Sequence, residues 1–314
     1  MLTSPLLAYR VCGRSTVTVC NDGASPIGSL RPSDRVQLED QAIHVPQRSA
    51  DALLPRVASR DLVEAIESTL FVLPAVTGLS QDLGIPGLRG RITKLSHPLA
   101  NLCGDARFSE READALIEKV RQRYKGLAFG WITGPSTRPA DLPRRLEAAG
   151  FQHADSIAGM ALTDLAQRID VNPRVRVREA NWDEAINQSE MMARAYGLPT
   201  EVNRLLNELI AASLDRIKTR GYFAYVDGDA PAAWGFLVYL PDSPTVLLGG
   251  AATLEEHRGK GLYTALVARR LADARADGRT AAIIQADRRT SAPIAAKLGF
   301  EELCGLEFFA SSGE

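Results

Sequence analysis

One pattern occurs twice in the chain and limits the folds that it can adopt. In each occurrence a predicted strand is followed by a short helix that ends at a Gly-Phe pair, and an apolar strand comes next; the pairs are Gly150-Phe151 and Gly299-Phe300. Internal likeness of this kind indicates one supersecondary unit used twice. Alternation of helices with apolar strands favours an α/β fold. We therefore predict two similar α/β units.

The chain of 314 residues is long enough for two domains with cores of their own. Residues 163–174, "TDLAQRIDVNPR", place polar residues and a proline between the two apolar regions, so we predict the boundary there. We expect a first domain at 51–168 and a second at 172–314. Residues 1–50 contain "NDGASPIGSLRPSDR" and few side chains to bury, and we expect them to form a poorly ordered extension.

Composition argues against several classes of function. Lysine and arginine number 37 against 38 acidic residues, so no bulk charge attracts nucleic acid. No stretch approaches the roughly 18 apolar residues needed to span a bilayer, and we expect no membrane association. The four cysteines have no C-x-x-C spacing and the four histidines do not pair, which predicts reduced thiols, a cytoplasmic protein and no metal. A transit peptide is a less favoured interpretation of the first twenty residues, which contain two arginines and no acid.

The second half contains a strand-to-helix junction with the composition of an anion-binding loop, "EEHRGKGLYTALVARRLADA", residues 255–274. The first amides of a helix lack intrahelical partners and lie at the positive end of its dipole. Gly259 and Gly261 permit positive φ and close approach of the backbone to a ligand. Arg258 and Lys260 add positive charge. We predict that this loop binds an anion, with pyrophosphate a better fit than a single carboxylate.

The helix after the loop has an apolar face that should pack on a sheet and fix its N-terminus in place. The residues of that face are Tyr263, Leu266, Val267, Leu271 and Ala274. We expect Arg269, Arg270 and Arg275 to lie mostly on the opposite face.

The loop "RGKGLY" resembles the R/Q-x-x-G-x-G/A signature of the GNAT acyltransferase superfamily, and "SAPIAAKLGF" resembles the later family segment that ends in L-G-F. This match covers about residues 172–314. In the first half, "WITGPSTRPADLPRRLEAAGF" and "AGMAL" resemble the closing segments of a degenerate GNAT-like domain, as in tandem proteins of the mycothiol synthase kind. The resemblance implies two tandem GNAT-like units, each a mixed, mostly antiparallel sheet flanked by helices.

The same resemblance implies that acetyl-CoA is the co-substrate and that the loop holds its pyrophosphate. Gly249-Gly250, inside the strand "TVLLGGAATL", predicts a bulge or a close backbone approach. The resemblance implies in addition that the strand splays there, so that its backbone pairs with the pantetheine arm. The implied acetyl-CoA contacts are Ala251, Thr253, Arg258, Gly259, Lys260, Gly261, Leu262 and Tyr263.

The sequence departs from the family pattern at three places. Tyr263 stands where the signature has Gly or Ala, and Ala295 stands where many members carry a tyrosine that protonates the leaving thiolate. In the first half, the corresponding junction "DARFSEREADA" has no glycine pair and carries Glu110 and Glu112 where a phosphate needs donors. We therefore expect the first domain to lack an acyl-CoA loop.

Three residues are candidates for catalysis. Ser291 lies at the start of the last helix. Its position suits either the N-cap of that helix or a residue that donates a proton to the leaving thiolate. Glu255 and Glu256 are interpreted either as solvated carboxylates that balance the charge of the basic loop or as bases that deprotonate an amine. The neighbouring His257 is a further candidate for that base.

These features predict an N-acetyltransferase that moves an acetyl group from acetyl-CoA to the amine of a small molecule by direct transfer in a ternary complex. Backbone amides near Thr253 would stabilise the oxyanion, and the helical region between Asn181 and Arg216 would recognise the acceptor. Two alternatives stay open. The second domain could bind an acyl-CoA as a non-catalytic sensor, or the chain could be an interaction module whose loop binds no nucleotide.

Overall fold

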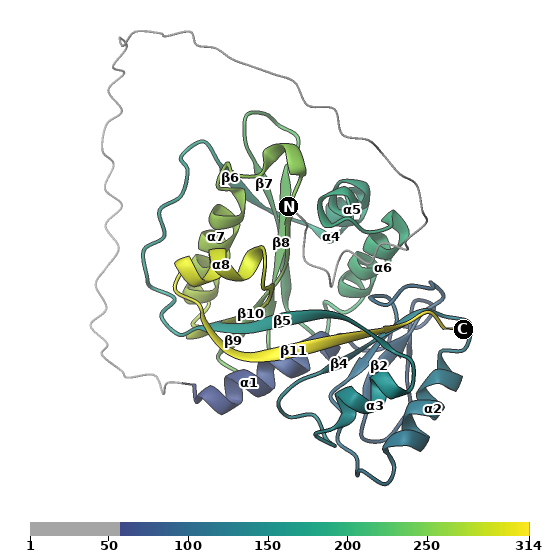
Figure 1. Ribbon diagram of the computed structural model, residues 1–314. Helices are drawn as coiled ribbons and strands as arrows, with labels where there is room; N and C mark the ends of the chain where they lie inside the picture. Colours follow the sequence, from purple (N-terminus) through teal and green to yellow (C-terminus); the bar gives the residue numbers. More distant parts are fainter. Residues whose placement is uncertain (1–56, 314) are drawn as a thin grey trace, which may run out of the picture. The chain divides into compact units, whose positions relative to one another are not determined.

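The computed structural model describes residues 57–313, and Figure 1 shows the arrangement of their helices and strands. The predicted N-terminal extension and the alternative of a transit peptide lie outside these residues. Within them, no helix is both long and apolar enough to cross a membrane.

The secondary structure follows the predicted order, with longer closing strands than the sequence pattern indicated. The helices are α1 (Ser59–Ser68), η1 (Thr69–Phe71), α2 (Ala113–Arg123), α3 (Leu142–Ala148), α4 (Trp182–Asn187), α5 (Ser189–Tyr196), α6 (Thr200–Ala211), η2 (Glu255–His257), α7 (Leu262–Ala276) and α8 (Ser291–Lys297). The strands are β1 (Gln81–Asp82), β2 (Arg89–Ile92), β3 (Leu102–Gly104), β4 (Phe129–Thr133), β5 (Gln152–Leu162), β6 (Arg176–Ala180), β7 (Thr219–Tyr225), β8 (Ala233–Tyr239), β9 (Thr245–Thr253), β10 (Ala281–Asp287) and β11 (Glu301–Ser311).

All described strands belong to one sheet in the order β1-β2-β3-β4-β11-β5-β10-β9-β8-β7-β6. Only two neighbouring pairs are parallel, β3 with β4 and β9 with β10, and the other pairs are antiparallel. One parallel pair falls in each half of the chain, as a repeated unit requires. The predicted α/β fold with a mixed, mostly antiparallel sheet is confirmed.

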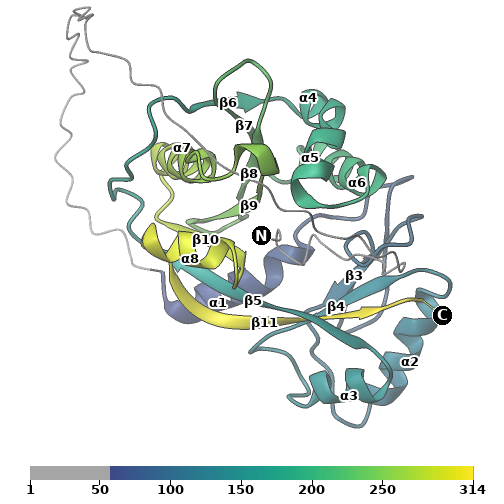
Figure 2. The same cartoon turned by 45° about the horizontal axis from the view of Figure 1, so that its top comes forward.

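The last strands of the two halves change places, which the repeat did not predict. β11 lies between β4 and β5, and β5 in turn lies between β11 and β10. Each half therefore places its closing strand inside the sheet of the other half. The two long strands run side by side across the middle of Figure 2.

Helices cover both faces of the sheet in the second half. Apolar residues of α1, α4 and α5 pack with Trp234 and Ile283 on one face. Residues of α7 and α8 pack with Leu237 and Ile284 on the other. In the first half, α2 and α3 bury Ile117 and other side chains against β4. Figure 2 shows α7 and the group α4–α6 on opposite sides of β7–β9.

Two polar residues that precede helices, Asn181 and Ser109, differ in whether they cap the helix that follows. Asn181 opens α4 with a full capping box to Glu184, as its position predicts. Ser109 does not open α2: its hydroxyl donates to Glu112 instead of accepting from that amide, and the helix begins four residues later. The helical region after Asn181 is interrupted at Gln188, which separates α4 from α5.

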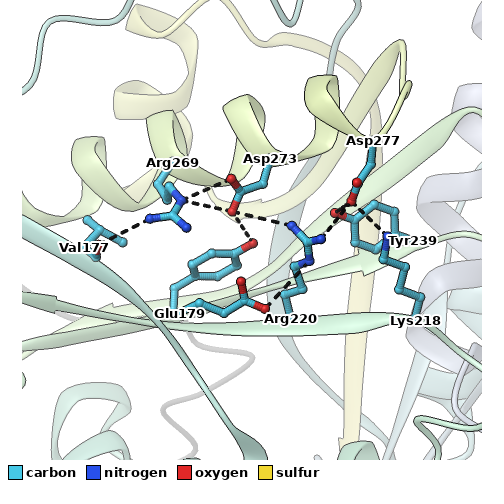
Figure 3. Close-up of polar contacts among 9 residues, drawn as sticks. Val177, Glu179, Lys218, Arg220, Tyr239, Arg269, Asp273 and Asp277 are labelled. Atoms are coloured by element: carbon cyan, nitrogen blue, oxygen red, sulfur yellow. Dashed lines mark hydrogen bonds and ion pairs between the residues drawn. The ribbon is translucent and has the colours of Figure 1, made fainter. Parts of the chain in front are cut away.

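A polar network fixes α7 against the strands beneath it (Figure 3). Asp273 accepts from Arg269 and from the hydroxyl of Tyr222 at 2.8 Å. One turn later Asp277 accepts from the Tyr239 hydroxyl at 2.5 Å. It also accepts from Lys218 at 2.9 Å, and Arg220 pairs with both aspartates. Because these contacts lie at the C-terminal half of α7, they hold the helix axis and leave its N-terminus unobstructed.

Replacing Asp277 with asparagine is expected to reduce the acid sensitivity of the fold. The hydrogen bonds from Tyr239 and then Lys218 lower the pKa of Asp277 in the folded protein. A lowered folded pKa contributes stability that is present above the unfolded value of about 3.9 and is lost as pH falls through the folded value. Urea unfolding at pH 7, at about pH 4 and at about pH 3 should show a smaller acid loss for Asp277→Asn than for the wild type.

Asp215→Asn is the matched control, because Asp215 is exposed and its only ion pair within residues 57–313 is with its neighbour Arg216, at 3.7 Å. Equal acid loss in the wild type and Asp277→Asn would contradict the assignment of this stability to the network.

Candidate active site

The predicted anion loop lies between η2 and α7, and both of its glycines have positive φ. Gly259 has φ +76° and Gly261, the N-cap of α7, has φ +85°. A Cβ on Gly261 would lie 3.3 Å from the Cβ of Asn172. Left-handed conformations disfavour side chains, β-branched ones above all. The backbone turn that delivers the chain to α7 therefore depends on glycine at these positions.

Six consecutive backbone amides at this turn have no acceptor among residues 57–313. They belong to Gly259, Lys260, Gly261, Leu262, Tyr263 and Thr264. The first intrahelical bond is donated by Ala265 to the Gly261 carbonyl, at 3.0 Å. Unpaired amides at the N-terminus of a packed helix form a binding site for phosphate groups.

Side chains around the loop hold it rather than fill it. Asn172, in the segment between β5 and β6, donates from Nδ2 to the Lys260 carbonyl at 2.9 Å. Lys260 Nζ lies 3.6 Å from Asp227, and Arg258 Nε donates to the Thr253 carbonyl at 3.3 Å. Both loop cations thus have protein partners, so the free donors come from the main chain.

Strands β9 and β10 separate next to the loop. Their parallel pairing covers only three residue pairs and ends at Ile283 opposite Leu247. From Leu248 to Thr253, β9 keeps its pairing with β8. Leu254 donates to Ala232 beside β8, and backbone groups alternate sides along a strand. Thr253 and Ala251 therefore direct their backbone groups toward the side from which β10 has departed.

A β-bulge accompanies the separation. The register between β8 and β9 shifts at Gly250, which has φ +31° and lies between the residues paired with Gly235 and Phe236. A Cβ on Gly249 would meet the Phe236 ring at 2.1 Å, and one on Gly250 would meet the Tyr196 hydroxyl at 2.5 Å. The predicted bulge is confirmed, and both glycines are sterically required.

Arg270 lies beneath the bulge and is only 1% exposed. Its Nη1 donates to the carbonyls of Phe236 and Gly249 at 3.0 and 3.1 Å, and its Nε donates to the Leu266 carbonyl. Burial lowers the pKa of Arg270, and no carboxylate within residues 57–313 pairs with it. The expectation that this arginine faces away from the sheet was wrong.

A cavity of about 260 Å³ opens where β9 and β10 separate. Gly249, Gly250 and Ala251 line it from β9, and Ile284 and Gln285 line it from β10. Tyr263 and Arg270 reach it from α7, and Ser291 from α8. The first half contributes Thr69, Leu70, Val72, Leu73, Arg91, Leu99 and Leu102, and α6 contributes Asn203, Leu206, Asn207 and Ile210. The cavity thus joins the predicted acyl-CoA strand to both halves of the chain.

The candidate catalytic residues separate into two places. Ser291 lines the cavity; its Oγ accepts from the Asp287 amide at 2.9 Å, and its hydroxyl proton has no acceptor among residues 57–313. It does not cap α8: the N-cap is Thr290, and Asp287 accepts from the amide at that position.

Glu255 and Glu256 lie on η2, outside the cavity lining and exposed to solvent. Glu256 pairs with Arg194 at 3.0 Å. A hydrogen bond from its own backbone amide, followed by the charge of Arg194, lowers the pKa of Glu256. A lowered pKa makes a carboxylate a weaker base. The structure therefore does not bring either glutamate together with Ser291.

The corresponding strand-to-helix junction of the first half, which carries Glu110 and Glu112, differs from the glycine loop before α7. The Glu112 carboxylate accepts from the Ser109 amide at 3.0 Å and from the Ser109 hydroxyl at 2.6 Å. The amide is already occupied by an acidic side chain of the protein. Among the described residues, no cluster of three or more potential metal ligands is found in either half.

Several residues of the cavity or of the loop were not singled out as site residues. Asn172 lies in a segment assigned only as a linker. Arg91 and Asn203 come from elements whose sequences carry no ligand motif. Tyr196 lies in the helical region that was predicted to recognise the acceptor, and burial raises its pKa in this structure. For Arg270 a signal existed, because helical spacing puts it one turn from Leu266 and Ala274 on the buried face.

Comparison with known proteins agrees with this geometry. The family model "Acetyltransferase (GNAT) family" matches residues 184–300. A GCN5-related N-acetyltransferase from Kribbella flavida has a similar structure, with a TM-score of 0.56 and 16% identity over 81% of this chain and 95% of that one. No curated protein matches the sequence.

Two further solved structures share the fold. A tandem GNAT protein from the clavulanic acid biosynthesis pathway has a TM-score of 0.53 and 17% identity, covering 72% of this chain and 78% of its own. A GCN5-related N-acetyltransferase from Sphaerobacter thermophilus has a TM-score of 0.52 and 15% identity, covering 72% and 76%. The family match identifies residues 184–300 as an acetyltransferase (GNAT) family domain, and the described part of the chain shares its fold with GNAT proteins, a tandem one among them.

Proposed function

We propose that the protein is an N-acetyltransferase that transfers the acetyl group of acetyl-CoA to the amine of a small molecule within a ternary complex. The observation that carries the proposal is the row of six free amides at the start of α7, beside a strand whose outward backbone groups border a cavity. We further propose that residues 51–168 are a degenerate unit without an acyl-CoA loop, that residues 172–314 bind acetyl-CoA, and that the protein is cytoplasmic.

The pyrophosphate would be held by the amides from Gly259 to Tyr263, with Arg258 and Lys260 as supplementary charges. The pantetheine arm of the co-substrate would then enter the gap between β9 and β10. There it would pair with the backbone groups of Ala251 and with the amide of Thr253, whose carbonyl accepts from Arg258, as an added strand would. Acetyl-CoA supplies an activated acyl group, and the chain supplies orientation.

Transfer requires a neutral amine. The amine nitrogen forms a bond to the acetyl carbon, the bond from that carbon to sulfur breaks, and the amine loses a proton while the thiolate gains one. Holding the two reactants in place supplies much of the acceleration, because an amine and a thioester already react with each other. Backbone donors near Thr253 would stabilise the oxyanion. Ser291 is the candidate proton donor to the thiolate, with Tyr196 as a second hydroxyl in the cavity.

Replacing Ser291 with alanine is expected to lower kcat about tenfold and to leave the affinity for acetyl-CoA unchanged. This decrease in kcat is smaller than the decrease expected on removing a stronger general acid, because a serine hydroxyl is a weak acid. Steady-state kinetics with a reactive amine, together with calorimetric titration of acetyl-CoA, separates these quantities. Ser59→Ala, at the first turn of α1 and outside the cavity, is the control. An unchanged kcat would remove Ser291 from the mechanism.

A non-catalytic acyl-CoA sensor is the second candidate. It is favoured by Ala295, which is buried in α8 where many family members carry a tyrosine. Calorimetry with acetyl-CoA, followed by an assay of thiol release across a panel of small amines, decides between the two functions. Binding with turnover supports the enzyme, and binding without turnover of any amine supports the sensor. Absence of binding excludes both.

A further inference from the structure

We infer that the acceptor carries a carboxylate beside its amine, as an apolar amino acid does, and that Arg91 binds that carboxylate. The inference rests on the proposed function, because it names the acceptor of the same site. It starts from the charge of the cavity wall. Two arginines line the cavity, Arg91 from β2 and Arg270 from α7, and no aspartate or glutamate is among the described residues that line it.

The guanidinium of Arg91 is only partly used by the protein. Its Nε donates to the Ala100 carbonyl at 3.1 Å and its Nη2 to the Leu99 carbonyl at 2.6 Å. Nη1 has no hydrogen-bond acceptor in residues 57–313, and no carboxylate in this range forms an ion pair with the side chain. The carbonyl contacts hold the side chain in place, so a ligand would meet a fixed cation with free N–H donors.

Burial without a counter-charge has a cost that an anionic ligand removes. Burial lowers the pKa of Arg91, and only Tyr124, whose hydroxyl donates to the Arg91 carbonyl at 2.9 Å, opposes this effect among residues 57–313. Arg89, two residues earlier on β2, differs: it is about half exposed and lies 3.9 Å from Asp105. Arg89 therefore has an acidic partner of its own, whereas neither of the two arginines that line the cavity has one among residues 57–313.

The other residues that line the cavity from the first half and from α6 are mostly apolar, with Thr69, Asn203 and Asn207 as the polar ones. Leu70 and Leu73 follow α1, Leu99 and Leu102 surround β3, and Leu206 and Ile210 lie on α6. An acceptor that fits would join an amine, an anion and a hydrocarbon group in a small volume. A carboxylate is the planar anion that matches a guanidinium, and an α-amino acid with an apolar side chain combines all three groups.

The same charges aid the chemistry. Two fixed cations disfavour the protonated form of a nearby amine and lower its pKa. The acceptor amine would therefore enter with less of its ammonium form, although no carboxylate base lines the described part of the cavity. The acceptor carboxylate offsets the charge of Arg91 while the amine stays neutral.

The test compares amino acids with their amides, which differ in the carboxylate and keep the side chain. Leucine, valine and phenylalanine are titrated calorimetrically, each against its amide, into the full-length protein saturated with CoA, so that no turnover occurs. At least one acid is expected to bind about tenfold or more tightly than its amide. A hydrogen bond to a charged group contributes a binding free energy of this size. Arg91→Gln should bring that ratio to within about threefold, and Arg91→Lys should keep part of it.

Arg89→Gln is the matched control and should leave the ratio unchanged. Thermal unfolding of each variant checks that the fold is retained. The inference is overturned if no acid in the panel binds, if amides bind as well as acids, or if Arg91→Gln keeps the wild-type ratio. Succinyl-CoA is compared with acetyl-CoA in the same variants. If Arg91→Gln selectively weakens succinyl-CoA, the carboxylate belongs to the acyl group instead. Acetyl-CoA binding to the wild type is read separately, and its absence defeats the proposed function itself.

Discussion

Replacing Gly261 with valine is expected to weaken acetyl-CoA binding by at least about 100-fold. Gly261 is the N-cap of α7 at φ +85°, where a β-branched side chain is strained by about 1–3 kcal/mol. The added atoms would also press on Asn172, whose side chain holds the Lys260 carbonyl. The loop would relieve both conflicts by turning its amides away from the phosphate position. Losing several such donors accounts for a 100-fold effect, which is about 2.7 kcal/mol.

Gly278→Val is a closely matched control for this variant. Gly278 follows the same helix at its other end and has φ +74°, and a Cβ added there would meet no atom within 4 Å. Both variants should lose similar stability in urea unfolding, because both force a β-branched residue into the left-handed region. Only Gly261→Val should lose acetyl-CoA in calorimetry. If both variants bind like the wild type, the backbone of this loop does not make the contact.

The loop and its helix could be predicted because their signals are local. Glycines that need positive φ, an N-terminus without a side-chain cap and an apolar face on α7 are each encoded within a few residues. The bulge at Gly249-Gly250 is of the same kind. These features form the side of the candidate site that we propose for acetyl-CoA, and all of them lie within residues 249–276.

The acceptor side could not be predicted in this way. Arg91 and Ser291 are two hundred positions apart and line one cavity because β5 and β11 bring the two halves into one sheet. Pairing between distant strands leaves no periodic signal in either segment, so the exchange was not visible. Arg270 is a different case, since its place on the buried face follows from helical spacing. Its charge favoured the solvent face, and three backbone carbonyls outweighed that preference.

Separating the two halves is expected to abolish the fold of each. Residues 172–314 produced alone would contain β11 without β4 or β5, and β10 without β5 along one edge. Phe308 and Phe309 of β11 are each 1% exposed in the full chain, and in this fragment they would lose the neighbouring strands β4 and β5. Removing the burial of one such side chain costs about 3–5 kcal/mol, which approaches the whole stability of a small domain. Circular dichroism and gel filtration should find this fragment unfolded or aggregated.

Cutting the backbone without removing either half should have a much smaller effect. A protease site inserted between Leu165 and Asp170, in the connection from β5 to β6, would leave both exchanged strands in place. The cleaved protein should elute as one species, unfold in one transition and keep its affinity for acetyl-CoA. Fragment 172–314 alone should bind none, even though it contains the complete loop. If that fragment folds and binds acetyl-CoA at the wild-type affinity, then the strand exchange is not needed to build the site, and α7 is held by its own half alone.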